Sequence, residues 1–318
     1  MAKEKAVNPH YRRLPLSKKL ARDFSHNKYK YLMILPVLVY LALFCYRPMY
    51  GIQIAFRNFK VTRGMARSPW VGFYWFEQFF NDPYFWRLLK NTFTISGLTI
   101  LFGFPAPIVL ALMLNEVRNS KFKRTVQTIT YMPYFISLVV LCSLIKIYTQ
   151  QYGLVSDIVT FFGGTRQNWL QDPRYFRAIY VISDIWQGIG WNSIIYLAAL
   201  SGIDQEQYEA ARIDGANRFQ QMVHITLPGL LPTITILFIL RMGSILNVGY
   251  EKILLLYQPT TYVVADVFST YTYRISLGAS NPQYSLSTAV SLFNTVVNVV
   301  FLLVTNFISR RTTESSLF

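Results

Sequence analysis

Two charged side chains interrupt stretches of the sequence that are otherwise apolar. Asp184 lies in the stretch 178–203, and Arg241 lies in the stretch 228–250. On insertion scales, a charge at the centre of a membrane-spanning helix costs about 2.5–3.5 kcal/mol unless it faces a cavity or a partner. The two side chains could form a structural ion pair, or they could bind a polar or charged solute.

Polar and aromatic side chains near these charges have the chemistry that a sugar needs. Indole and phenol rings offer stacking faces, and amides and hydroxyls offer hydrogen bonds. A further polar stripe at helical spacing, which ends with Thr305, indicates one face of a helix that lines either a cavity or a helix contact. The candidate solute path therefore comprises Asp184, Trp186, Trp191, Asn192, Tyr196, Arg241, Asn247, Ser287, Ser291, Asn294 and Asn298.

Catalytic chemistry is not expected of this chain. The histidines His10, His26 and His224 have no nucleophile or metal-ligand arrangement around them in the sequence. Cys45 and Cys142 lie in separate apolar stretches and form no disulfide framework. No glycine is followed by lysine, so a G-x-x-x-x-G-K-[ST] phosphate loop is absent from the sequence. We therefore predict a protein that is not an enzyme and holds no metal or cofactor of its own.

The composition indicates the class of protein in which these side chains are placed. The 318 residues are 53% apolar and only 14% charged, whereas soluble domains are about 25% charged. So little charge would leave a large apolar surface exposed to water in a soluble protein. The sequence therefore predicts an integral membrane protein.

Six apolar windows are long enough to cross a membrane, which takes about 20 residues. They predict an all-α fold with six transmembrane helices at 31–51, 91–115, 125–145, 178–203, 228–250 and 286–309. The first window could instead be a cleaved signal peptide, but no small-residue cleavage site follows it. We predict that it is retained.

The basic residues predict the orientation. Nine Lys or Arg residues precede Tyr31, and four lie in the short loop 116–124. Because basic loops stay in the cytoplasm, both termini are expected there, with 1–28 as a basic cytoplasmic tail and 29–318 as the transmembrane domain. The opposite face is also net positive, which favours either loops packed on headgroups or a partner, or attraction of an anionic solute.

The inner loop between the fourth and fifth windows has the pattern of two short helices. Asp204 is a good N-cap for a helix that ends near residue 213 or 214, and Gln207 stands where it could complete a capping pair. Gly215 suits the left-handed position that ends a helix. Asn217 can then begin a second helix that leads to the fifth window.

This loop resembles the EAA loop of permease subunits in binding-protein-dependent ABC importers. The resemblance rests on an EAA triplet, a glycine four residues later and an I-x-L-P segment. It implies that the loop, 204–227, forms a coupling helix that docks on an ATP-binding subunit. The implied coupling residues are Glu209, Ala210, Ala211, Asp214, Gly215, Ile225, Leu227 and Pro228. The family often has Pro and then Leu where Gln205 and Gln207 stand, so the contacts with the ATPase groove are expected to differ.

Five further segments are similar to the carbohydrate-uptake branch of these importers, and most similar to its polysaccharide and oligosaccharide subgroup, which imports alginate and rhamnogalacturonan fragments. They are 68–73, 82–93, 122–133, 186–204 and 247–259. The resemblance implies the type I ABC importer permease fold in a bacterial inner membrane. It also implies a second, homologous permease subunit in a heterodimer, two ATP-binding cassette subunits that bind ATP and Mg, and an extracytoplasmic solute-binding protein. Membrane lipid and a glycan are the other expected partners, and nucleic acid is not.

The charges then suggest the type of glycan. The outer face is net positive, and Arg241 presents a fork that suits a carboxylate. We therefore predict an acidic oligo- or polysaccharide, derived from alginate or pectin. A neutral oligosaccharide is the main alternative. A secondary transporter is less favoured, because such proteins commonly show inverted repeats and this sequence shows none on inspection.

Overall fold

The computed structural model describes residues 23–24, 26–312 and 316–317, so most of the predicted tail 1–28 lies outside the described residues. The described part is helical apart from loops and one isolated antiparallel bridge between Arg57 and Trp70. The chain forms two compact units, Met1–Ile54 and Ala55–Phe318. The boundary therefore falls at the end of the first span.

The first unit is built around one apolar helix. It contains α2 (Lys28–Tyr40), the π-helical turn η2 (Leu41–Tyr46) and α3 (Arg47–Met49), which continue into a 3₁₀ turn, η3 (Tyr50–Phe56). After Lys28 and Lys30 the side chains of α2 are apolar or aromatic on all sides, and none of them is buried. A helix that is hydrophobic all round is typical of a membrane span.

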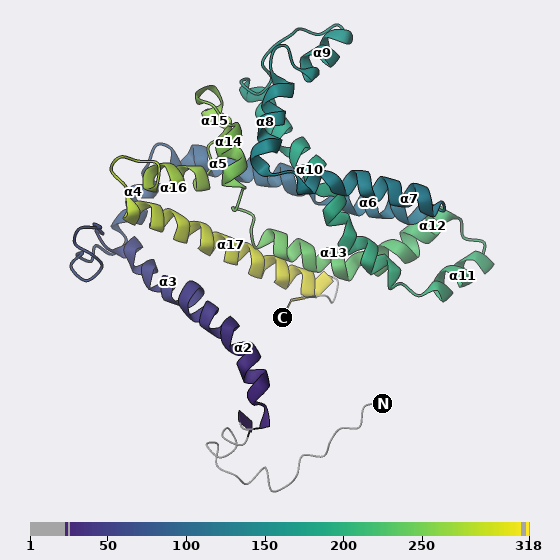
Figure 1. The fold of residues 1–318 in the computed structure, drawn as a ribbon, viewed down its shortest axis with the longest axis horizontal. Coiled ribbons are helices and arrows are strands. Elements are labelled where there is room, and N and C mark those ends of the chain that lie inside the picture. The colour runs from purple at the N-terminus through teal and green to yellow at the C-terminus, as the bar shows by residue number, and fades with distance from the viewer. Residues whose placement is uncertain (1–22, 25, 313–315, 318) are drawn as a thin grey trace. The chain divides into compact units, whose positions relative to one another are not determined.

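The second unit contains the other helices (Figure 1). In chain order they are α4 (Tyr74–Phe80), α5 (Phe85–Leu98), η4 (Thr99–Gly103), α6 (Pro105–Glu116), α7 (Ser120–Tyr131), η5 (Met132–Phe135), α8 (Leu138–Thr149), α9 (Leu154–Phe161), α10 (Pro173–Ser201), α11 (Gln205–Ile213), α12 (Arg218–Gln221), η6 (Met222–Thr226), α13 (Leu227–Met242), α14 (Tyr250–Leu256), η7 (Pro259–Thr261), α15 (Tyr262–Ala265), α16 (Phe268–Ser276) and α17 (Tyr284–Thr312).

Five helical stretches in the described residues are long and apolar enough to cross a membrane. They are Lys28–Phe56, Phe85–Glu116, Leu138–Phe161, Arg218–Met242 and Tyr284–Thr312. The fourth predicted window coincides with α10, whose 29 residues are also long enough. It is less apolar than the other five because it includes Arg174, Arg177 and Asp184. Five apolar stretches and α10 thus correspond to the six predicted helices.

The third span differs from its prediction, because the apolar helix begins at Leu138 and not at residue 125. The chain is extended at Ile136 and Ser137, and the Ser137 hydroxyl accepts a hydrogen bond from the Val140 amide at 3.4 Å. This side chain starts a new helix in the way an N-cap does. The residues before the break belong to α7, which is amphipathic. The prediction located spans by the absence of charged residues. It therefore missed the helix break at Ser137, because serine is uncharged.

The fifth span also differs, because α13 ends at Met242 and not at residue 250. A Cβ on Gly243 would lie 2.5 Å from Leu302 Cδ1, so any larger residue would require the Leu302 side chain to move. The irregular segment 243–249 follows. Its Ile245 carbonyl accepts a hydrogen bond from Ser96, and its Leu246 amide donates to Asn298 Oδ1 at 2.9 Å. Irregular backbone at membrane depth is tolerated where protein groups satisfy it in this way.

The core of the second unit is organised around α10. Tyr180 and Phe176 pack in an apolar cluster with side chains of α5, α8 and α14, and Tyr196 packs with α6 and α13. Gly190 allows the closest approach, because a Cβ there would lie 2.1 Å from the Thr130 carbonyl oxygen of α7. A third cluster of Phe79 and other aromatic side chains joins α4, α5, α16 and α17. These contacts fix the face of α10 that carries Asp184.

A buried carboxylate joins the helices on the side of the membrane opposite α11. Asp266 is fully buried, and its two oxygens accept hydrogen bonds from the Arg274 guanidinium at 3.0 and 2.7 Å. Thr270 Oγ1 donates to the same carboxylate at 2.8 Å, and Arg87 lies 3.8 Å away. The hydrogen bonds from the Arg274 guanidinium to Asp266 raise the pKa of that arginine, so it stays charged.

An Asp266→Leu substitution is expected to destabilise the permease. It leaves Arg274 half-buried without its carboxylate, and breaking a buried pair in this way costs about 3–5 kcal/mol. The thermal unfolding midpoint of the purified complex should fall by several degrees. The matched control is Asp157→Asn, which removes the exposed pair between Asp157 and Arg166 and should change the midpoint little. Equal shifts for the two variants would contradict a structural role for the buried cluster.

Candidate functional site

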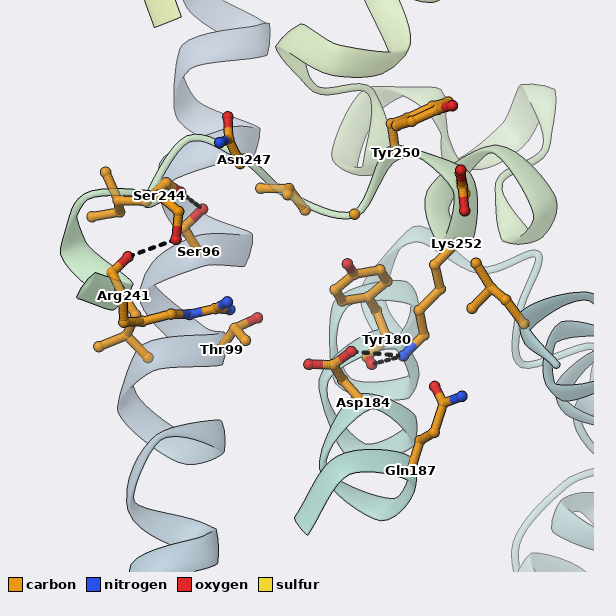
Figure 2. A pocket seen from close by; sticks show the side chains of 16 residues that line it. Ser96, Thr99, Tyr180, Asp184, Gln187, Arg241, Ser244, Asn247, Tyr250 and Lys252 are labelled. Atoms are coloured by element: carbon orange, nitrogen blue, oxygen red, sulfur yellow. Dashed lines mark hydrogen bonds and ion pairs between the residues drawn. The ribbon is translucent and has the colours of Figure 1, made fainter. Parts of the chain in front are cut away.

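A cavity of about 460 Å³ lies between α5, α10 and the segment that follows α13 (Figure 2). From α5 and η4 it is lined by Ser96 and Thr99, and from α10 by Tyr180, Asp184 and Gln187. From the C-terminal end of α13 onward it is lined by Arg241, Ser244, Asn247, Tyr250 and Lys252, among others. The break in α13 therefore brings the segment 243–249 into the wall of the cavity.

Asp184 forms an ion pair with Lys252. Lys252 Nζ lies 3.3 Å from Asp184 Oδ1 and donates a second hydrogen bond to the Tyr180 carbonyl oxygen at 3.2 Å. The ammonium also lies 4.7 Å from the centre of the Tyr180 ring. The Lys252 side chain is 5% exposed, and that of Asp184 is 42% exposed. One of the two expected roles of Asp184 was a structural ion pair with Arg241. The structure shows instead a pair between Asp184 and Lys252.

Arg241 projects toward the same cavity from the end of α13, with its guanidinium beside Thr99 and on the opposite side from Asp184 (Figure 2). It is exposed, and no carboxylate of the described residues lies within 4.0 Å of it. Lys252 balances the charge of Asp184. Of the two basic side chains that line this cavity, Arg241 is therefore the one without an ion-pair partner among the described residues.

Lys252 was not among the residues that the sequence predicted. It lies beyond the fifth apolar window, in a segment expected to be a loop. The only hint is a Glu-Lys pair that directly precedes four apolar or aromatic side chains in α14. A lysine in such a segment must either reach water or find a partner, and here it reaches back to α10.

A second cavity of about 630 Å³ adjoins the first and extends along α10 toward the coupling loop. The two cavities share Thr99, Asp184, Arg241 and Ser244. Among the predicted path residues, Trp191, Asn192 and Tyr196 line the second cavity. The Trp191 ring stacks on Tyr134 at a centroid distance of 4.7 Å, so the second ring occupies one of its faces.

Five predicted path residues do not line these two cavities. Trp186 is exposed elsewhere on α10, and Ser291 is exposed on α17. Ser287 donates to the Tyr284 carbonyl oxygen, and Asn294 is buried. Asn298 donates to Asn247 Oδ1 at 3.1 Å, besides accepting from the segment after α13. Asn298 thus holds the wall of the cavity in place from behind.

The inner loop forms two short helices. Asp204 Oδ1 accepts a hydrogen bond from the Glu206 amide at 3.0 Å and so caps α11. The predicted capping pair with Gln207 is not seen, and a capping box forms one helix later, between Asn217 and Gln220. α12 begins after Asn217 and continues through η6 into α13.

Gly215 ends α11 in the left-handed conformation, with a φ of +80°. The Ala216 amide donates to the Ala211 carbonyl oxygen at 2.8 Å, and the Gly215 amide donates to the Arg212 carbonyl oxygen at 3.1 Å. This pair of hydrogen bonds is the Schellman motif. It turns the chain sharply between α11 and α12 and leaves both helices at one end of the second unit (Figure 1).

The predicted coupling residues gather around this turn. Glu209, Asp214 and Gly215 are exposed, as are Ala210, Leu227 and Pro228, while Ala211 and Ile225 are half-buried. Two apolar side chains that the sequence analysis did not single out are also exposed, Ile213 at 86% and Phe219 at 69%.

Two contacts connect the loop to the rest of the unit. The hydroxyls of Tyr208 and Thr226 lie 2.9 Å apart, which joins α11 to the start of α13. Arg218 Nη1 lies 3.4 Å from Glu116 Oε2, which joins α12 to the end of α6. The Tyr208–Thr226 contact therefore links α11 to the residue directly before α13.

Comparison with known proteins agrees with this architecture. The sequence model of the family described as "Binding-protein-dependent transport system inner membrane component" matches residues 103–314. The chain is 43% identical over 293 residues to Protein LplB of Bacillus subtilis (strain 168), covering 92% of each chain. It is 42% identical over 302 residues to the polygalacturonan/rhamnogalacturonan transport system permease protein YteP of the same organism, covering 95% of this chain and 94% of YteP.

A solved structure shows the same fold. It is described as the crystal structure of a bacterial ABC transporter involved in the import of the acidic polysaccharide alginate. Its matching chain is 44% identical, with a TM-score of 0.85, over 93% of this chain and 99% of the other. The predicted type I ABC importer permease fold is thereby confirmed. The chain belongs to the family of inner membrane components of binding-protein-dependent transport systems.

Proposed function

We propose that this chain is one permease subunit of an ATP-driven importer that carries an acidic oligo- or polysaccharide into the cytoplasm. The observation that carries the proposal is Arg241. It lines a cavity between α5, α10 and the segment after α13, and Lys252 already balances the nearby Asp184. The guanidinium is therefore available to a carboxylate of the solute.

The other groups in the two cavities suit a sugar. Gln187 and Asn247 offer amides, Ser244 offers a hydroxyl, and Trp191 and Tyr250 offer aromatic surface. Arginine binds a carboxylate through two parallel hydrogen bonds. A uronate, which combines a carboxylate with ring hydroxyls, uses all of these groups at once.

The relatives support the acidic character. YteP is a polygalacturonan/rhamnogalacturonan permease, and a solved relative belongs to an importer of the acidic polysaccharide alginate. Polygalacturonan and alginate are both polymers of uronic acids. A permease that handles either polymer must neutralise carboxylates inside the membrane, where an unpaired charge is costly.

Partner subunits complete the proposed importer. Because this sequence has no phosphate loop, ATP and Mg are bound by two ATP-binding cassette subunits, which contact the loop 204–227. A second permease forms the other half of the path, and a solute-binding protein delivers the glycan from outside. In support, one solved relative is in complex with an alginate pentasaccharide-bound periplasmic protein. Both termini and the coupling loop face the cytoplasm.

The contacts of the loop indicate how hydrolysis acts on the solute. Closure of the ATP-binding subunits displaces α11, and the Tyr208–Thr226 contact passes this displacement to α13. α13 carries Arg241 at its far end. The same helix therefore connects the coupling loop to the group that we assign to the carboxylate, and its movement opens the path alternately to each side.

Purified complex in lipid vesicles is expected to hydrolyse ATP faster when its solute-binding protein carries a uronate oligomer. Neutral oligomers of equal length should stimulate hydrolysis at most weakly, because they lack the carboxylate that pairs with Arg241. Stimulation by neutral oligomers alone would overturn the acidic assignment. Uptake without nucleotide would instead indicate a secondary transporter.

A further inference from the structure

A third cavity, of about 430 Å³, lies outside the path described above. Its walls come from the loop after the first span and from the turn before α17, which both lie on the side of the membrane opposite the coupling loop. The side chains that matter here are Asn58, Lys60, Trp75, Asn281, Gln283 and Tyr284. The volume is within the range of about 300–1,000 Å³ that is typical of small-molecule sites.

Hydrogen bonds between distant parts of the chain fix these walls. The Phe59 amide donates to Ser285 Oγ at 2.9 Å, and Ser285 Oγ donates to the Arg57 carbonyl oxygen at 2.6 Å. Trp75 Nε1 donates to the same carbonyl oxygen at 2.9 Å. Ser285 is buried between the two segments. The walls of the cavity are therefore ordered before a ligand binds. This order reduces the conformational entropy that the protein loses on binding.

The Arg57 side chain holds the rest of the loop. Its guanidinium donates to the carbonyl oxygens of Met65 and Ser68 at 3.2 and 3.0 Å. The Ser68 hydroxyl in turn donates to the Gly64 carbonyl oxygen at 2.7 Å. Arg57 is thus engaged in shaping the loop, and it is not among the lining side chains.

The lining combines one positive charge with amides and aromatic rings. Lys60 is its only charged side chain. The sequence from Arg57 to Phe76 contains no acidic residue, and no carboxylate of the described residues lies within 4.0 Å of the Lys60 ammonium. Asn58, Asn281 and Gln283 supply donors and acceptors. The Lys60 side chain is exposed, so a ligand that enters the cavity can reach its ammonium group.

We propose that this cavity is an outer subsite for the acidic glycan, in which Lys60 pairs with a uronate carboxylate and the three amides bind ring hydroxyls. The inference rests on the proposed function, and it adds a first binding position before the intramembrane path. The subsite receives one end of the glycan as it leaves the solute-binding protein. An anionic lipid headgroup shares the carboxylate's charge, but it lacks the ring hydroxyls that the three amides of the lining can bind.

Direct binding of a small uronate tests the subsite. The assembled complex is placed in nanodiscs of phosphatidylcholine alone, and the binding of trigalacturonate is measured by titration calorimetry. An Arg241→Gln background removes the intramembrane cation. In that background, Lys60→Gln is expected to weaken trigalacturonate binding about tenfold, the effect of losing one charge-assisted hydrogen bond. Maltotriose, which is neutral, should bind equally to both forms.

The matched control is Arg63→Gln. Arg63 is an exposed basic residue of the same loop but does not line the cavity, so its loss should change the affinity less than twofold. Equal weakening by Lys60→Gln and Arg63→Gln would show diffuse attraction and overturn the subsite. Loss of all trigalacturonate binding in the Arg241→Gln background would also overturn it, yet would leave the proposed function standing.

Two further outcomes are separable. If trigalacturonate binding disappears when phosphatidylglycerol replaces part of the phosphatidylcholine, the cavity belongs to a lipid headgroup. If uronate oligomers fail to stimulate hydrolysis by the unaltered complex and neutral ones succeed, the acidic assignment fails, and the subsite fails with it.

Discussion

A Gly215→Val substitution is expected to lower solute-stimulated ATP hydrolysis about tenfold or more in the assembled importer. Gly215 has a φ of +80°, and its missing Cβ would meet no atom within 4 Å. The penalty is therefore purely one of backbone conformation, and it exceeds about 1–2 kcal/mol for a β-branched residue. Relief of this strain undoes the turn and re-aims Ile213 and Phe219, the two protruding apolar side chains.

Gly215→Asn is the matched control for this turn, because asparagine adopts the left-handed conformation more readily than other non-glycine residues do. It should retain most of the stimulated hydrolysis. Co-purification of the ATP-binding subunits establishes that each variant assembles. An assembled Gly215→Val complex with normal stimulated hydrolysis would refute the assignment of the loop 204–227 to coupling.

An Arg241→Gln substitution is expected to reduce uronate transport about ten- to hundredfold at low solute concentration, while basal hydrolysis stays unchanged. Hydrogen bonds to charged groups contribute about 1.5–3 kcal/mol each, and every 1.4 kcal/mol is a factor of ten. Glutamine keeps much of the length of the arginine side chain, but it has neither the positive charge nor the two parallel N–H donors of the guanidinium. The measurement compares glycan uptake into proteoliposomes with hydrolysis in the absence of solute.

Arg241→Lys should fall between the parent and the glutamine variant, because lysine keeps the charge but loses the two parallel hydrogen bonds. This gradation distinguishes recognition of a carboxylate from a purely structural role. Parallel losses of transport and basal hydrolysis in both variants would instead show that Arg241 supports the fold.

The sequence predicted the fold because its strongest signals are local. Apolar windows locate most spans, and Asp204, Gly215 and Asn217 each determine a helix end through their own side chain or backbone. The breaks near Ser137 and Gly243 were missed because both residues are uncharged. The close neighbour of Gly243, Leu302, also lies far away in the sequence.

The sequence predicted the residues that line the solute path less well than it predicted the helices of the coupling loop. The sequence offered an ion pair between Asp184 and Arg241 as one alternative, whereas in the structure both side chains line the same two cavities and Asp184 pairs with Lys252. It did not reveal that Lys252 folds back to bind Asp184. That contact depends on where α13 ends, and the end of α13 depends on tertiary packing. The stripe on α17 was similarly ambiguous, because a polar face can contact a helix as well as a solute.

The irregular segment 243–249 also determines when the protein acquires its path during synthesis. Its backbone is satisfied by Ser96, from the second span, and by Asn298, from the last. An unsatisfied backbone group in lipid costs several kcal/mol, so this segment cannot settle while only the first five spans are in the membrane. The wall that carries Asn247 is therefore completed only after α17 has been inserted. A partly synthesised permease therefore lacks this wall of the cavity.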